Sequence, residues 1–133
     1  MTVQTQETQV RDIAQLHEQL IDYLKQGKFA EGIEDFYAHD VVAQENGNPS
    51  RTGRDALAAA EKEYLAGVTR YDGIEVFNKL VRDDGDGNGL VIYECAMKWH
   101  HRDGGEVHVQ QAVVEHWRDA KIQNIRFYGT FIP

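Results

Sequence analysis

The chain has 133 residues, of which 41% are hydrophobic and 27% charged, and this length and composition are typical of one globular domain. Its 14 Lys and Arg against 22 Asp and Glu leave a formal net charge of −8. That balance argues against partners such as nucleic acid or an anionic membrane surface, which are bound through clustered basic residues, and the single cysteine, Cys95, excludes an internal disulfide framework.

Hydrophobic spacing predicts three helices in the first half of the chain. Residues 1–7 are polar and aperiodic, and we expect a flexible tail there, followed by one domain over residues 8–133. Apolar residues at steps of three and four predict a first helix over about residues 8–25. Similar spacing predicts a second helix over about residues 29–40 and a third over about residues 54–66.

In the second half of the chain, apolar and polar residues alternate as is typical of strands. The predicted strands, including a short one between the last two helices, are residues 41–45, 74–81, 90–101, 107–117 and 122–128. Residues 83–89 are rich in Asp and Gly, and we expect a mobile hairpin loop there. Helices followed by a run of strands predict an α+β fold, with a strongly curved antiparallel sheet wrapped around the helices.

The hairpin between the two longest strands can be placed in register. A loop of Asp103, Gly104 and Gly105 pairs Arg102 with Glu106, and extending this pairing sets Trp99 opposite Val109 and Tyr93 opposite Glu115. One face then carries Val91, Tyr93, Cys95, Met97, Trp99, Val109, Gln111, Val113, Glu115 and Trp117. The other face is polar and carries Glu94, Lys98, His100, His108, Gln110 and His116.

Two polar residues, Gln111 and Glu115, fall on the apolar face. A buried carboxylate is costly unless it is paired or protonated, and such groups are found where a pocket needs them. The structural alternative is that Glu115 is hydrated near the open end of the sheet or is paired with an arginine. The three histidines His100, His108 and His116 are spread along the polar face and cannot share one ion, so we expect no metal site and no cofactor.

Several segments together resemble the nuclear transport factor 2-like superfamily, in particular its SnoaL-like bacterial members. The segments are Phe36–Val42, Gln44–Gly47 followed by Gly53–Ala56, and Trp117–Ile122 followed by Arg126–Tyr128. The resemblance covers about residues 8–130. It implies a cone-shaped sheet closed by three helices, an internal cavity, and homodimers that associate through the sheet.

The resemblance also bears on chemistry, because the superfamily includes ketosteroid isomerases, polyketide cyclases, epoxide hydrolases and non-catalytic members. Glu45 matches the aspartate that transfers the proton in the ketosteroid isomerases. Leu20 and Val113 stand where those enzymes have their tyrosine and protonated aspartic acid, and Phe127 stands where SnoaL-type cyclases have an acid. The chain therefore departs from both catalytic patterns.

Two classes of function follow for the expected cavity. In the first, Glu45 and Glu115 are the catalytic acid and base of a cofactor-independent isomerase, cyclase or hydratase that acts on an apolar, oxygenated small molecule. The ligand-binding candidates are Asn46, Tyr93, Trp99, Gln111, Phe127 and Tyr23. In the second, the domain is a non-catalytic ligand-binding or dimerisation module. Since the chain shows no signal-peptide pattern and no apolar run near the ~20 residues of a spanning helix, we expect a cytoplasmic protein.

Overall fold

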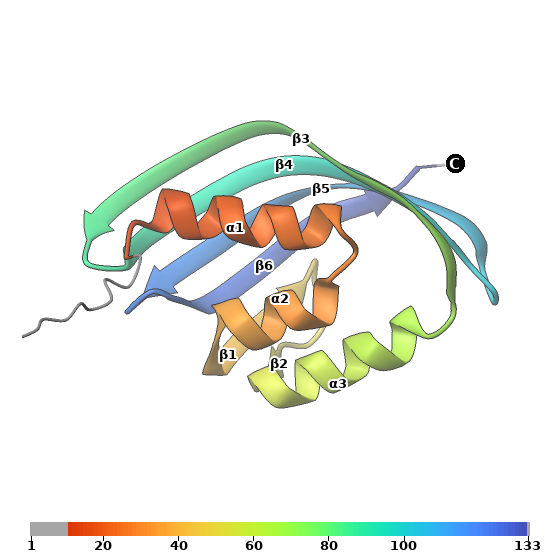
Figure 1. Cartoon of the computed structure of the whole chain (residues 1–133), viewed down its shortest axis with the longest axis horizontal. Coiled ribbons are helices and arrows are strands. Elements are labelled where there is room, and N and C mark those ends of the chain that lie inside the picture. Colours follow the sequence, from red (N-terminus) through yellow and green to blue (C-terminus); the bar gives the residue numbers. More distant parts are fainter. Residues whose placement is uncertain (1–10, 133) are drawn as a thin grey trace, which may run out of the picture.

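The computed structural model describes residues 11–132, which form three helices and one six-stranded sheet (Figure 1). The helices are α1 (Ile13–Lys25), α2 (Phe29–Phe36) and α3 (Arg54–Leu65). The strands are β1 (Tyr37–Glu45), β2 (Arg51–Thr52), β3 (Val68–Gly85), β4 (Asn88–His101), β5 (Gly105–Arg118) and β6 (Lys121–Phe131). This order confirms the predicted α+β fold. The expected tail, residues 1–7, and the expected start of the domain at residue 8 lie outside the described residues.

The sheet is mixed and open. Its strand order is β2-β1-β6-β5-β4-β3, so β2 and β3 are its two edges. Every neighbouring pair is antiparallel except β1 and β6, which run parallel. The expectation of a wholly antiparallel sheet was therefore wrong at this pair. No tight turn joins β1 to β6, so nothing in the local chain forces them into opposite directions.

The long strands curve over the helices, as the cone-shaped prediction requires. In Figure 1, β3 and β4 arch over α1 and β5 passes behind it, while α2 and α3 lie below it. The β3–β4 register shifts between Tyr71 and Gly73 and again between Val76 and Asn78. Such irregularities increase local twist and bend a strand, and Gly73 adopts a φ of 108°, which favours glycine. The concave face of the sheet is thereby turned toward the helices.

Two helix boundaries differ from the prediction. The helix α1 begins at Ile13 because the Asp12 side chain accepts a hydrogen bond from the Gln15 amide and caps the helix there. The helix α2 ends at Phe36 rather than near residue 40. Tyr37 instead begins β1, where it pairs with Ile122 of β6.

The acidic segment 83–89 joins two paired strands as the expected hairpin, but its loop is only a two-residue turn, shorter than predicted. Strand pairing continues through Asp83 opposite Gly89 to Gly85 opposite Asn88. Asp86 and Gly87 then make the turn with φ of 56° and 84°. The Asp86 carboxylate also accepts a hydrogen bond from Arg11 at 2.7 Å. Positive φ angles and cross-strand pairing together order a segment that composition alone marks as loop.

The predicted β4–β5 register was wrong by two residues. Trp99 lies opposite Val107, Tyr93 opposite Val113 and Val91 opposite Glu115. Gly105 has the expected positive φ of 69°, but it pairs with His101 and the loop is residues 102–104. Because side chains alternate with a period of two, this shift leaves every residue on its predicted face.

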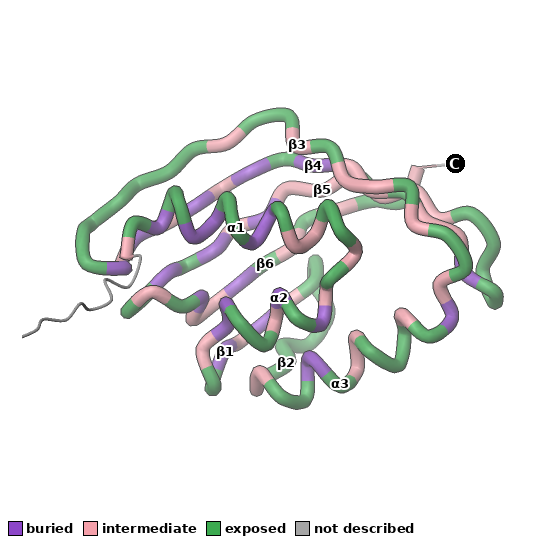
Figure 2. The backbone as a smooth tube through the Cα atoms, viewed as in Figure 1, coloured by how far each residue is buried: buried purple, intermediate pink, exposed green. Residues whose placement is uncertain are grey.

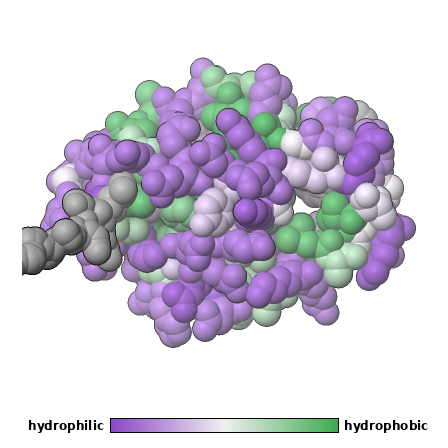
Figure 3. Space-filling view, viewed as in Figure 1, coloured by the Kyte–Doolittle hydropathy of each residue, from purple (hydrophilic) through white to green (hydrophobic). Residues whose placement is uncertain are grey.

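The apolar core lies between the concave face of the sheet and α1. Figure 2 shows the buried residues concentrated along α1 and the facing strands, whereas most of β3 is exposed. The core residues with no exposed surface are Ile13, Val41, Val91, Cys95, Val113 and Ile122. In Figure 3 the surface over α1 and α2 is largely hydrophilic, and a hydrophobic area lies toward the end of α3. Among the described helices, none is long and apolar enough to cross a membrane.

Candidate functional site

A cavity of about 680 Å³ lies between the concave face of the sheet and the helices. This volume is in the range of sites for small organic molecules. Side chains from α1, α2, α3 and all six strands line it, and most of the wall is aliphatic or aromatic. Its ionisable lining residues, apart from tyrosines, are Glu45, Arg51, Glu61 and Glu115. The chemistry of the cavity therefore depends on where these four groups lie.

Glu115 is a fully buried carboxyl group on the cavity wall. Its Oε1 atom lies 2.8 Å from Nδ1 of His17 and accepts a hydrogen bond of 3.0 Å from Nε1 of Trp117. Its Oε2 atom is equally buried and has no hydrogen-bond partner among the described residues. One oxygen is thus held in place by two neighbours, while the other is left without a partner.

Local sequence explains how the His17–Glu115 pair forms. Alternation along β5 directs Val113, Glu115 and Trp117 to the concave face. On α1, His17 follows Ile13 by four residues and precedes Ile21 by four, so it belongs to the buried stripe of that helix. His17 is fully buried, and the α1 stripe faces the sheet, so the imidazole reaches Glu115. The charged or polar side chain beside Glu115 is therefore a histidine, and not an arginine.

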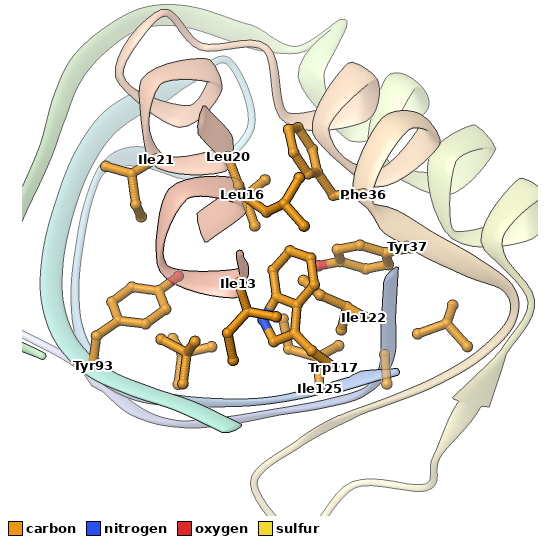
Figure 4. Close-up of a cluster of buried hydrophobic side chains, with 14 of the residues drawn as sticks. Ile13, Leu16, Leu20, Ile21, Phe36, Tyr37, Tyr93, Trp117, Ile122 and Ile125 are labelled. Carbon is orange, nitrogen blue, oxygen red and sulfur yellow. The ribbon is translucent and has the colours of Figure 1, made fainter. Parts of the chain in front are cut away.

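Two tyrosines, Tyr37 and Tyr93, supply hydroxyl groups beside Glu115. They approach from opposite sides of the core with their hydroxyl oxygens directed inward (Figure 4). Both side chains line the cavity and are buried. Burial and then the nearby Glu115 carboxyl raise the pKa of Tyr37 and of Tyr93 well above the usual value. Both phenols therefore stay protonated and can donate hydrogen bonds at neutral pH.

A second group of charges, Glu45, Arg51 and Glu61, lies near the exposed end of the cavity. Glu45 and Arg51 are exposed, at the end of β1 and in β2, and Glu61 projects from α3 and is partly buried. Burial and then the Glu45 carboxylate raise the pKa of Glu61, and Arg51 partly opposes this shift. None of these three side chains forms an ion pair with another described residue. This end of the cavity thus holds two carboxyl groups and one guanidinium group.

The structure brings most of the predicted site residues to one cavity. Glu45, Tyr93, Trp99, Gln111, Glu115 and Phe127 all line it. Trp99 donates from Nε1 to the Tyr64 hydroxyl at 2.8 Å, and Gln111 lies 3.8 Å from the Cys95 sulfur through its Nε2 atom. The position of these six residues on the cavity lining is compatible with ligand binding, while their individual roles stay predictions.

Asn46 and Tyr23 lie outside the cavity lining. Asn46 bridges to the backbone of Gly129, donating from Nδ2 to its carbonyl at 3.2 Å and accepting from its amide at 3.0 Å. The Tyr23 hydroxyl donates to Asp35 at 2.7 Å, and its ring contacts Phe36 edge-on. In this structure both side chains make contacts that tie neighbouring segments together.

His17, Tyr37 and Glu61 were not identified from the sequence. His17 carried a signal, since a polar residue on the apolar stripe of α1 needs a partner when it is buried. Hydrophobic spacing places Tyr37 in the predicted second helix, so it does not predict the position of this residue on β1. Glu61 lies on an alanine-rich helix with several other acids, and no sequence feature distinguishes it from Glu63.

One group of metal-ligating side chains occurs within residues 11–132, outside the cavity. Ligand atoms of Asp72, His100 and Glu106 lie within 4.8 Å of one another. Arg70 donates to Asp72 at 2.7 Å, and Lys98 lies 3.9 Å from Glu106. These cationic partners account for the arrangement as a surface ion-pair network.

Comparison with known proteins relates the chain to others through its fold. No protein-family model matches the sequence, and no curated protein is similar to it. Among solved structures, a protein from Mesorhizobium loti provisionally described as a SnoaL-like polyketide cyclase is 21% identical, with a TM-score of 0.63 over 87% of this chain and 97% of that one.

Two further solved structures are similar to the chain in fold. A Catenulispora acidiphila protein with a ketosteroid isomerase-like fold, in complex with trimethylamine, is 15% identical, with a TM-score of 0.64 over 85% and 83% of the chains. An epoxide hydrolase-like protein of M. tuberculosis is 18% identical, with a TM-score of 0.65 over 87% and 80%. The chain therefore has the nuclear transport factor 2-like fold, shared by SnoaL-like and ketosteroid isomerase-like proteins.

Proposed function

We propose that this protein is a cofactor-independent acid/base enzyme, of isomerase, cyclase or hydratase type, acting on a small, mostly apolar molecule that carries a carbonyl or hydroxyl group. The observation that carries this proposal is the buried Glu115, whose Oε1 is held by His17 and Trp117 while Oε2 has no partner among the described residues. A buried carboxyl group left half satisfied on the wall of a cavity is suited to bind or exchange a proton with a ligand.

The surrounding residues supply the other parts of a proton transfer. The Glu115 carboxylate takes a proton from a carbon beside the ligand carbonyl, so that a C–H bond breaks and an O–H bond forms. The electron pair moves toward the carbonyl oxygen, which accepts hydrogen bonds from the hydroxyls of Tyr37 and Tyr93. Where a C=C bond adjoins the deprotonated carbon, return of the proton to the far carbon of that bond shifts the C=C bond into conjugation with the carbonyl and completes an isomerisation without loss or gain of atoms or electrons. His17 is a positioning residue, because it orients Glu115 and need not touch the ligand.

The apolar walls favour this chemistry over reactions of highly charged substrates. Leu20, Ile33, Met97 and Phe127 line the same cavity, and they exclude water from the reacting groups. The trimethylamine complex of the Catenulispora neighbour supports small-molecule binding by this fold. The second candidate function is a non-catalytic binding module, favoured by the fact that the hydrogen bonds of His17 and Trp117 also serve simply to satisfy a buried acid.

Hydrogen–deuterium exchange into ketones distinguishes the two functions. The protein is incubated in D₂O with a panel of small aryl ketones, and NMR follows loss of the protons beside each carbonyl. We expect protein-dependent exchange for at least one ketone, and a decrease of about 10²–10⁴-fold in Glu115→Gln, the usual contribution of a general base. Glu75→Gln is the matched control, because Glu75 is exposed on β3 and outside the cavity lining. Binding without exchange would overturn the catalytic proposal in favour of the binding module.

We also propose that the protein is a cytoplasmic homodimer that associates through the outer face of the sheet. The exposed large apolar residues on that face include Phe77, Leu80 and Tyr128, on β3 and β6. Such side chains are candidates for burial in an interface. Light scattering would give the dimer mass, and Leu80→Glu would shift it toward the monomer. The single free thiol, Cys95, agrees with a reducing compartment.

A further inference from the structure

The cavity is unevenly charged along its length. Three carboxyl groups, those of Glu45, Glu61 and Glu115, line it against one basic residue, Arg51. Glu115 is bound by His17 and Trp117. Neither Glu45 nor Glu61 has an ion-pair partner among residues 11–132. A ligand entering this cavity therefore meets an excess of negative charge.

The strand registers separate the carboxyl groups into two ends. Glu45 lies opposite Phe127, which lies opposite Val113, and Glu115 is two residues farther along β5. Two strand spacings of ~4.8 Å and two residue rises of ~3.3 Å place the Cα atoms of Glu45 and Glu115 about 12 Å apart. One ligand with polar groups at both ends can therefore contact Glu115 at its inner end and the Glu45–Glu61 group at its outer end.

Aromatic side chains line the cavity beyond Glu45, on the side away from Glu115, because Trp99 lies opposite Tyr71 and Val107, and Val107 is six residues from Val113 along β5. Tyr64, Tyr71 and Trp99 contribute to the wall, and Trp99 is fixed by its hydrogen bond to the Tyr64 hydroxyl. The faces of aromatic rings attract organic cations, and the attraction grows where water is excluded. Carboxyl groups combined with aromatic walls suit an ammonium group better than a carboxylate or a phosphate.

We propose that the natural ligand is an amphiphilic amine, with a carbonyl or hydroxyl group directed to Glu115 and a positively charged nitrogen held between Glu45 and Glu61. This inference rests on the proposed function for the inner end of the cavity. It adds a second subsite and a substrate class. A second, independent feature of the same cavity supports a ligand there, since Oε2 of Glu115 is buried without a partner among the described residues.

Three ketones of one shape and different charge test the proposal. They are 4-(aminomethyl)acetophenone, which is cationic, 4-methylacetophenone, which is neutral, and 4-acetylbenzoate, which is anionic. Titration calorimetry or NMR gives the dissociation constant of each. We expect the cation to bind about tenfold more tightly than the neutral ketone and the anion to bind most weakly, with the advantage of the cation falling as salt is added. Equal or tighter binding of the anion would overturn the proposal, and would assign the outer end to Arg51.

Glutamine variants locate the subsite. Glu61→Gln removes one charge with little change of shape, and we expect the ratio of neutral to cation dissociation constants to fall about fivefold or more. Glu63→Gln is the matched control, because Glu63 lies on the same helix, is exposed and is outside the cavity lining. If the ratio is the same in Glu61→Gln as in Glu63→Gln, and circular dichroism shows that both variants are folded, the subsite is refuted.

The same probes separate this inference from the proposed function. Deuterium exchange in the neutral ketone reports on Glu115 alone, whereas the order of the three dissociation constants reports on the outer end. Exchange without a preference for the cation refutes the amine subsite and leaves the enzyme proposal standing. A preference for the cation without exchange supports the subsite and refutes the acid/base role.

Discussion

The substitution His17→Leu removes one partner of the buried Glu115 carboxyl group. Both residues are fully buried, and Nδ1 of His17 lies 2.8 Å from Oε1 of Glu115. Leucine keeps an apolar side chain in the buried stripe of α1, but Glu115 is left with Trp117 as its hydrogen-bond partner. We therefore expect the variant to fold with a clearly lower free energy of unfolding.

The expected loss follows from the burial of the pair. Removing one hydrogen-bond partner of a buried polar or charged group costs about 1–5 kcal/mol, because the remaining group stays desolvated. Since Trp117 still donates to Oε1, we expect an intermediate loss, about 3 kcal/mol. With an unfolding entropy of about 2.1 cal/mol/K per residue, a chain of this length should show a midpoint temperature about 11 °C lower.

Urea unfolding at pH 7, followed by circular dichroism and tryptophan fluorescence, measures the loss. The dependence on urea concentration should keep its slope, so that the midpoint alone reports stability. His116→Leu is the control, because it makes the same change on an exposed neighbour in β5, and it should alter stability by less than about 0.5 kcal/mol.

The double variant His17→Leu/Glu115→Met completes the test. Replacing both partners of a buried hydrogen-bonded pair by apolar residues of similar shape is often nearly neutral, so the double variant should recover most of the stability lost in His17→Leu. A loss below about 1 kcal/mol in the single variant, or no recovery in the double variant, would show that the two side chains do not form the buried pair described above.

Two further predictions concern other parts of the molecule. A Cβ atom at Gly67 would lie 2.4 Å from Nε2 of His101, so Gly67→Ala should destabilise the protein by about 1–3 kcal/mol in urea unfolding. Gly104 has open space around it, so Gly104→Ala should not destabilise the protein. Equal effects of the two substitutions would contradict the packing of His101 against Gly67. Because the pKa of Tyr37 and of Tyr93 is raised in the folded state, the unfolded chain loses these protons first, and stability should be complete below pH 10 and fall above it. Absorbance at 295 nm should show these two phenols ionising only as circular dichroism reports unfolding, and ionisation in the folded state would contradict their burial.

Local sequence determined the elements and their buried faces. Periods of 3.6 and 2 identify α1, α3 and the long strands, because each element must bury one side against the rest of the chain. Alternation alone was sufficient to place Tyr93 and Glu115 on the concave face, even though the register of the hairpin was wrong by two residues. A shift of two preserves the face of a strand, which is why the error did not affect these assignments.

Tertiary structure decided which polar groups meet. His17 and Glu115 are 98 residues apart in the chain, and their contact depends on how α1 lies across the sheet. The parallel pairing of β1 with β6 likewise sets Glu45 at the cavity, although no local pattern determines the neighbour of β1. Hydrophobic periodicity acts within one element and specifies its buried side, whereas contacts between elements depend on the packing of the whole domain. The sequence by itself thus determined a small acidic α+β domain with a carboxyl group on its buried face, and only the folded chain made that carboxyl group part of a site.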